Sequence, residues 1–226
     1  MKKPELIIYD FDGTLCNTLP DIAESMNVIL EEQGLPRIPE MRIRDFIGSG
    51  ILKLVERSIR YALSQKQQRS VNAEEVQQAG KAMAEYYRQH LVDRSHLYPG
   101  VKEVLSYFRN IPQIVVSNKP EAMVYEMLEH FKIHKAFSLL VGGDTLEVLK
   151  PDPAVWKYVL ASLKLREPLP GWMLGDSLPD LQFARAAALT PILVSYGYND
   201  VPLLKEAGAE VVIDDLRELI QLYEKL

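Results

Sequence analysis

Two aspartates separated by one residue stand near the start of the chain, in the segment IIYDFDGTL that covers residues 7–15. The apolar run Leu6–Tyr9 predicts a buried strand, and Gly13 predicts a turn. Asp10 and Asp12 are therefore expected at the carboxyl end of that strand, where open α/β folds bind ligands. Because neighbouring carboxylates repel each other, the pair indicates a site where a cation or a reaction uses both.

Three further polar segments follow predicted strands or lie just beyond them: SNKP at 117–120, KPDP at 150–153 and GDSLPD at 175–180. Each alone has an ordinary explanation. Ser117 and Asn118 suit a turn and a helix cap, and Lys150 suits an exposed position. Asp180 suits the first turn of a helix, where its charge is favourable. Because all of these segments lie at strand ends, we expect them to form one site with Asp10.

The positions of these segments depend on alternating short apolar runs and helical patterns, which predict a parallel sheet wrapped by helices. Strands are expected at Leu6–Tyr9, Gln113–Val116, Ser138–Val141, Trp172–Leu174, Pro191–Val194 and Glu210–Ile213. Helices are expected at Val101–Arg109, Glu121–Phe131, Pro153–Leu163, Leu178–Ala187, Val201–Ala207 and Leu216–Leu226.

Residues 17–93 show helical patterns with no convincing strand. One helix is expected after Asn17 or Thr18, a second over Ile51–Leu63, and a third from Asn72, where Glu75 completes a capping-box pattern. We therefore predict an α/β core of residues 1–16 and 94–226 that is interrupted by a helical domain of residues 17–93.

Composition narrows the possible functions. The 226 residues carry a net charge of −5 and no basic stripe, which disfavours nucleic acid as a partner; the segment Lys66–Arg69 is interpreted as a solvated loop. The single cysteine, Cys16, excludes an internal disulfide. Because the chain has no apolar run long enough for a signal peptide or a membrane span, we expect a cytoplasmic protein with no membrane contact.

Together, the motif order and the helical insertion resemble the haloacid dehalogenase superfamily, in its phosphatase branch. The resemblance covers essentially the whole chain and implies a Rossmann-like parallel sheet with an inserted helical cap of the C1 type. Further segments resemble the phosphoglycolate phosphatase subfamily: YPGV at 98–101, GGDT at 142–145 and YGYN at 196–199. Asn17 departs from the pattern, because relatives commonly carry aspartate there.

The resemblance implies a role for each residue. Asp10 would attack phosphorus to give an aspartyl phosphate, and Asp12 would protonate the leaving oxygen and then activate water. Dehalogenases of the superfamily lack the second aspartate, so Asp12 favours phosphoryl transfer. Mg²⁺ would be held by the Asp10 and Asp176 carboxylates and the Asp12 carbonyl, with Asp180 as an outer-shell partner or an additional ligand. The phosphate would be bound by Ser117, Lys150 and the backbone N–H groups near Phe11, Asp12 and Asn118.

Substrate choice is expected to come from the helical insertion. Arg44 and the segment Gly48-Ser49-Gly50, just before a predicted helix, could bind a small carboxylate such as that of 2-phosphoglycolate. An ordinary helix start with flexible glycines is an equal alternative.

The leading hypothesis is an Mg²⁺-dependent phosphomonoesterase, monomeric or homodimeric, with 2-phosphoglycolate as the first-choice substrate. The alternatives are a phosphatase for a sugar or amino-sugar phosphate, a phosphomutase, and a regulatory phosphate-binding protein with an inactive site.

Overall fold

The computed structural model describes residues 1–65 and 70–226, so the predicted loop Lys66–Arg69 lies outside the described residues. The chain divides into two compact units. The first, Met1–Asn17 with Leu97–Leu226, is named the α/β unit here, and the second, Thr18–His96, is named the helical unit.

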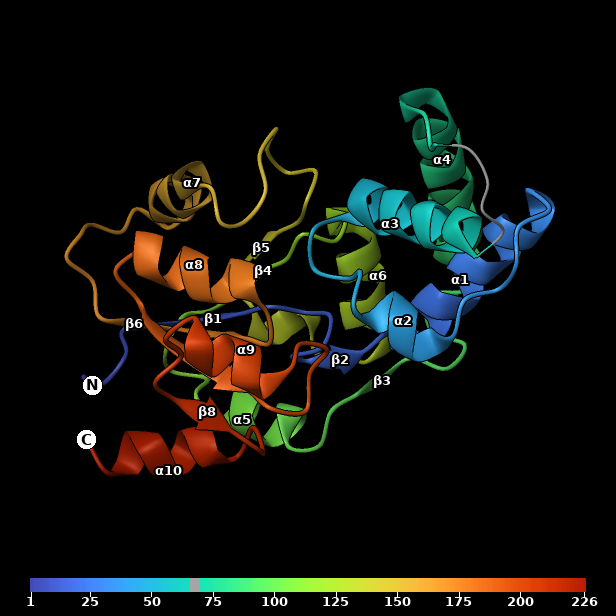
Figure 1. The fold of residues 1–226 in the computed structure, drawn as a ribbon. Coiled ribbons are helices and arrows are strands. Elements are labelled where there is room, and N and C mark those ends of the chain that lie inside the picture. The colour runs from blue at the N-terminus through green and yellow to red at the C-terminus, as the bar shows by residue number, and fades with distance from the viewer. Residues whose placement is uncertain (66–69) are drawn as a thin grey trace. The chain divides into compact units, whose positions relative to one another are not determined.

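A six-stranded sheet forms the centre of the α/β unit, in the order β5-β4-β1-β6-β7-β8 (Figure 1). Every neighbouring pair is parallel, which confirms the predicted fold class. The bounds of β1 and β4 are as predicted, and those of the other strands differ by one or two residues at their ends. The strands are β1 Leu6–Tyr9, β4 Gln113–Val116, β5 Leu139–Val141, β6 Gly171–Gly175, β7 Thr190–Val194 and β8 Val212–Ile213.

Helices cover both faces of this sheet (Figure 1). Alternate strand residues such as Leu6 and Ile8 share a buried apolar cluster with side chains of α7 (Pro153–Leu163) and α8 (Leu178–Ala186). On the opposite face, the ring of Phe108, which directly follows α5 (Val101–Tyr107), lies 6.2 Å from that of Trp172 in β6. The Phe108 ring lies 5.4 Å from that of Tyr223 in α10 (Glu218–Glu224). The remaining helices are α6 (Glu121–His130), the short 3₁₀ helix η1 (His134–Ala136) and α9 (Val201–Glu206).

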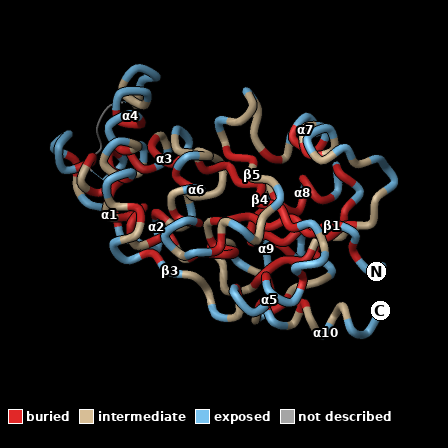
Figure 2. The backbone as a smooth tube through the Cα atoms, turned by 180° about the vertical axis from the view of Figure 1, so that it is seen from behind, coloured by how far each residue is buried: buried red, intermediate tan, exposed pale blue. Residues whose placement is uncertain are grey.

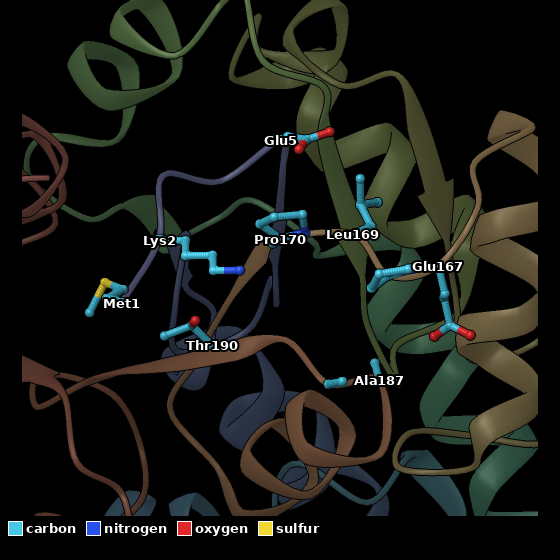
Figure 3. A pocket seen from close by; sticks show the side chains of 11 residues that line it. Met1, Lys2, Glu5, Glu167, Leu169, Pro170, Ala187 and Thr190 are labelled. Carbon is cyan, nitrogen blue, oxygen red and sulfur yellow. The ribbon is translucent and has the colours of Figure 1, made fainter.

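The two ends of the sheet differ in character. At the amino ends of β1 and β6 lies a pocket to which Lys2, Glu5 and Glu167 contribute (Figure 3). All the predicted motifs follow the carboxyl ends of their strands, at the other edge of the sheet. The backbone is buried along the central strands that lead to this edge (Figure 2).

The helical unit contains α1 (Leu19–Glu32), α2 (Glu40–Arg44), α3 (Ile51–Ser64) and α4 (Ala73–Gln89). Thr18 is the N-cap of α1, and the Asn72 side chain accepts a hydrogen bond from the Glu75 N–H at 2.8 Å, so both predicted helix starts are confirmed. The sequence pattern did not predict α2, because its five residues give too little periodicity.

A buried carboxylate joins the two ends of the helical unit. Asp21 in α1 accepts hydrogen bonds from the N–H groups of Arg94 at 3.0 Å and Ser95 at 2.7 Å, and from the Ser95 hydroxyl at 2.7 Å. Residues 94–95, predicted to belong to the core, therefore cluster with the helical unit. Nearby, β2 (Cys16–Asn17) and β3 (His96–Leu97) pair as a two-stranded sheet that the sequence did not predict.

Among the described residues, no helix is both long enough and apolar enough to cross a membrane.

Candidate active site

The register of the sheet brings the predicted motifs together. Tyr9 in β1 is aligned with Val115 in β4 on one side and with Leu174 in β6 on the other. The residues that follow these strands, among them Asp10, Ser117 and Asp176, therefore lie at one edge of the sheet. Asp10, Ser117 and Asp176 all belong to the α/β unit.

Asp10 is buried and its carboxylate is held in place from two sides. Its Oδ1 accepts a hydrogen bond from the Phe11 N–H at 2.7 Å and lies 3.1 Å from the Lys150 Nζ. This Phe11 N–H was predicted to bind phosphate, but here it orients Asp10. Burial and the negative charge of Asp180 raise the pKa of Asp10 to about 7, although Lys150 opposes the shift.

Lys150 links two acids. Its Nζ lies 3.1 Å from Asp10 Oδ1 and 2.7 Å from Asp180 Oδ1, and its side chain is buried. Burial alone would lower the pKa of Lys150, but the two carboxylates raise it above its ordinary value. A permanent positive charge therefore lies beside Asp10.

Asp180 is engaged by groups of the protein itself. Oδ1 accepts from Lys150, while Oδ2 accepts from the Ser177 N–H at 3.0 Å, the Ser177 hydroxyl and the Asp176 N–H at 3.2 Å. Ser177 and Asp180 also form the capping box that begins α8. Of the two predicted roles, this bonding favours that of an outer-shell partner over that of a direct metal ligand.

Asp176 follows β6 and is fixed by segments far from it in sequence. Oδ1 accepts from the Thr14 hydroxyl at 3.2 Å, and Oδ2 accepts from the Tyr198 N–H at 2.7 Å. Gly13 and Gly197 pack directly on this carboxylate: a Cβ at Gly13 would lie 2.5 Å from Asp176 Oδ2, and one at Gly197 would lie 2.1 Å from Asp176 Cβ. Burial, with the charges of Asp180 and Asp10, raises the pKa of Asp176 well above its ordinary value.

The donor set fits a hard divalent cation. Asp10, Asp176 and Asp180 are buried and each offers a carboxylate oxygen within 4.8 Å of the others. The raised pKa values of Asp10 and Asp176 show that the protein alone does not compensate their charges. Oxygen ligands of this kind suit Mg²⁺.

Asp12 lies outside this carboxylate group and forms a separate ion pair. Its Oδ1 lies 3.0 Å from the Nζ of Lys119, and both side chains are largely buried. The sequence segment SNKP includes Lys119, but a role for this residue was not predicted. The only signal was a lysine directly after a predicted strand end.

Ser117 and Asn118 directly follow β4, and both form hydrogen bonds with nearby backbone groups. Ser117 is buried at the end of β4, where its Oγ accepts a hydrogen bond from the Lys119 N–H at 3.4 Å. The Asn118 side chain bonds the backbone of Lys150 twice, donating to its carbonyl at 3.2 Å and accepting from its N–H at 2.9 Å. The Asn118 side chain therefore braces the Lys150 segment.

The helical unit contains the two remaining predicted residues. Arg44 ends α2, with its guanidinium 3.5 Å from the Asp45 carboxylate. The Ser49 hydroxyl accepts a hydrogen bond from Arg57 at 3.4 Å, and Arg57 also donates to the Phe46 carbonyl at 3.1 Å. Arg57 was not predicted, because it gives no signal beyond a polar position in a predicted helix.

A parallel sheet with buried acids and a lysine at its carboxyl edge is the arrangement of an α/β enzyme whose active site uses carboxylates. A sequence model of the family described as haloacid dehalogenase-like hydrolase matches residues 7–194. The chain therefore belongs to the haloacid dehalogenase-like hydrolases, as predicted.

Relatives match over nearly the full length of the chain. A phosphoglycolate phosphatase of Chromobacterium violaceum is 33% identical over 224 residues, which cover 98% of this chain and 97% of that protein. One from Haemophilus influenzae is 36% identical over 221 residues, with 96% and 97% covered. The crystal structure of a protein described as a predicted phosphoglycolate phosphatase from Haemophilus somnus aligns with a TM-score of 0.90 at 31% identity, covering 98% and 99% of the two chains.

Proposed function

We propose that this protein is an Mg²⁺-dependent phosphomonoester hydrolase that acts through an aspartyl phosphate, with 2-phosphoglycolate as its substrate. The observation that carries the reaction type is the buried carboxylate of Asp10 beside Lys150, within a group of acids that suits a divalent cation. The relatives named phosphoglycolate phosphatase support the choice of substrate.

Asp10 and Asp12 have different roles in the proposed reaction. An Asp10 oxygen attacks phosphorus as the bond to the leaving oxygen breaks, and Asp12 gives its proton to that oxygen. Water then attacks phosphorus of the aspartyl phosphate as the bond from phosphorus to the Asp10 oxygen breaks. A proton of the water passes to Asp12, the Asp10 carboxylate is restored, and inorganic phosphate leaves. The two acids support this division because each pairs with a different lysine, so their environments differ.

The other residues would position the metal ion and the substrate and would stabilise negative charge during the reaction. Mg²⁺ would be held by the carboxylates of Asp10 and Asp176 and the carbonyl of Asp12, with Asp180 as an outer-shell partner. The metal ion would offset negative charge on the substrate and on the acids. Lys150 and the Ser117 hydroxyl would bind phosphate oxygens. Phosphoryl transfer depends mainly on such positioning and electrostatics.

We assign the phosphate chemistry to a core of residues 1–16 and 94–226, and substrate recognition to a cap of residues 17–93. At the boundaries, Asn17 clusters with the α/β unit and residues 94–96 cluster with the helical unit. Arg44 and Ser49 in the cap would bind the carboxylate of the substrate. Arg44→Ala should raise KM for 2-phosphoglycolate more than KM for p-nitrophenyl phosphate. Arg42→Ala, in the same helix, is the matched control. An equal rise for both substrates would argue against carboxylate binding by Arg44.

A panel of phosphorylated metabolites assayed with Mg²⁺ tests the function. The proposal predicts the highest kcat/KM for 2-phosphoglycolate and no turnover by Asp10→Asn. A higher value for a sugar or amino-sugar phosphate would assign a different metabolite, and return of the phosphoryl group to substrate would indicate a phosphomutase. No hydrolysis across the panel would leave a phosphate-binding regulatory protein.

The expected setting is the cytoplasm, because a single buried cysteine suits a reducing compartment. The expected oligomeric state is a monomer or a homodimer.

A further inference from the structure

Lys119 is held rigidly beside the phosphate chemistry, although the mechanism above gives it no role. Its carbonyl accepts a hydrogen bond from the Gly143 N–H at 2.7 Å, and its N–H donates to the Ser117 hydroxyl at 3.4 Å. The ammonium lies 6.0 Å from the centre of the Phe11 ring and 3.0 Å from Asp12 Oδ1. The Lys119 side chain is 4% exposed, so solvent screens its charge little.

The ion pair with Lys119 determines where the carboxylate of Asp12 lies. Asp12 is two residues from Asp10, yet its carboxylate is not part of the acid group formed by Asp10, Asp176 and Asp180. Gly13 turns the chain with a φ of +80°, directly after Asp12. A cation near the acid group would attract the Asp12 carboxylate.

A purely structural role explains this pair poorly. A buried ion pair adds little net stability, because the cost of removing both charges from water offsets their attraction. In contrast, a group that fixes the orientation of a reacting carboxylate is required for the rate increase that this carboxylate provides.

We infer that Lys119 is a positioning residue for Asp12: it keeps the carboxyl group of Asp12 directed at the leaving oxygen and away from the cation ligands. This inference rests on the proposed function, in which Asp12 protonates the leaving group. In that step the bond from phosphorus to the leaving oxygen breaks while the bond to Asp10 forms. The proton on Asp12 must reach the departing oxygen, so its placement controls the rate.

Leaving-group dependence separates this role from the alternatives. Phenyl phosphate and p-nitrophenyl phosphate have similar shapes, but phenolate is the poorer leaving group and depends more on protonation. Values of kcat/KM with Mg²⁺ are measured for wild type, Lys119→Met, Lys119→Arg and Asp12→Asn. Lys157→Met, at an exposed position in α7, is the matched control.

The inference predicts that Lys119→Met loses at least tenfold more activity toward phenyl phosphate than toward p-nitrophenyl phosphate. The upper limit of this selective loss is the whole contribution of a general acid, which is about 10²–10⁴. Asp12→Asn should show the same selective loss, Lys119→Arg should recover part of it, and Lys157→Met should behave as wild type. Melting curves establish that each variant is folded, and Lys119→Gln replaces Lys119→Met if the latter unfolds.

Several outcomes would overturn the inference. Equal losses for both aryl phosphates would show that Lys119 acts on stability or binding. A selective rise in KM for 2-phosphoglycolate, with equal losses for both aryl phosphates, would instead mean that Lys119 contacts the substrate carboxylate. A wild-type protein that hydrolyses neither these aryl phosphates nor any phosphorylated metabolite of the panel with Mg²⁺ would remove the role of Asp12 and the inference with it. This failure of the proposed function is distinguishable, because it is seen without any variant.

Discussion

Replacing Asp10 by asparagine should make the metal-free protein more stable while it removes activity. The substitution keeps the shape of the side chain and an oxygen that can accept from the Phe11 N–H. It removes one charge from a buried group of acids. Lys150 retains Asp180 as a partner at 2.7 Å.

The size of the effect follows from the pKa of Asp10, which is raised from 3.8 to about 7. At about 1.4 kcal/mol per pKa unit, the ionised form costs about 4 kcal/mol when the pH is well above 7. Relaxation and water penetration reduce such costs, so we expect about half, or about 2 kcal/mol. For a chain of this size this corresponds to a rise in Tm of about 4–8 °C.

The pH dependence has a definite sign. Between about pH 4 and pH 7 the unfolded chain releases the Asp10 proton while the folded protein keeps it, so wild type loses stability as pH rises through this window. Asp10→Asn lacks this contribution. The difference in Tm should therefore be clearly larger at pH 8 than at pH 5.

Thermal unfolding in EDTA at both pH values measures this difference. Glu210→Gln makes the same carboxylate-to-amide change at an exposed position, and we expect it to move Tm by about 1 °C or less. Added Mg²⁺ should stabilise wild type at pH 8 more than Asp10→Asn. An Asp10→Asn variant that is less stable than wild type at pH 8, or a difference as large at pH 5, would refute the electrostatic reasoning.

Three other substitutions test how the structure supports the site. Gly197→Ala should push the Asp176 carboxylate aside and weaken Mg²⁺ binding by about tenfold or more, as measured by titration calorimetry; unchanged affinity would contradict this. Asn118→Leu should leave the Lys150 backbone groups without their partner and lower the free energy of unfolding by about 2 kcal/mol in urea denaturation. Asp21→Ala should cost about 3 kcal/mol in the same measurement, because the N–H groups of Arg94 and Ser95 and the buried Ser95 hydroxyl lose a charged acceptor. An Asp21→Ala variant as stable as wild type would show that water replaces the carboxylate.

The sequence predicted the sheet well for a physical reason. Each central strand is a short apolar run bounded by turn-forming residues, so its ends could be located closely, as for Leu6–Tyr9 and Gln113–Val116. Parallel pairing then requires the residues after these strands to meet at one edge. The grouping of Asp10, Lys150 and Asp176 could be predicted in this way.

The contacts of individual side chains could not be predicted. The Asn118 side chain bonds the backbone of Lys150, 32 residues later, and Lys119 pairs with Asp12, 107 residues earlier. Neither spacing has a local signature, because the rotamer of a polar side chain depends on the packing around it. The short elements α2, β2 and β3 were missed because so few residues contain no periodicity.

The position of β1 in the sheet has a consequence for how the protein is made. β1 lies between β4 and β6, which end at Val116 and Gly175, so this strand pairs with strands that are synthesised much later. The helical unit, in contrast, is one continuous stretch, Thr18–His96, and can fold as a local unit during synthesis. Pairing over such long separations is slow, because a large loop must close first. A nascent chain should therefore hold a folded helical unit before the acid group of Asp10, Asp176 and Asp180 can form, because that group requires β6 and the residues after it.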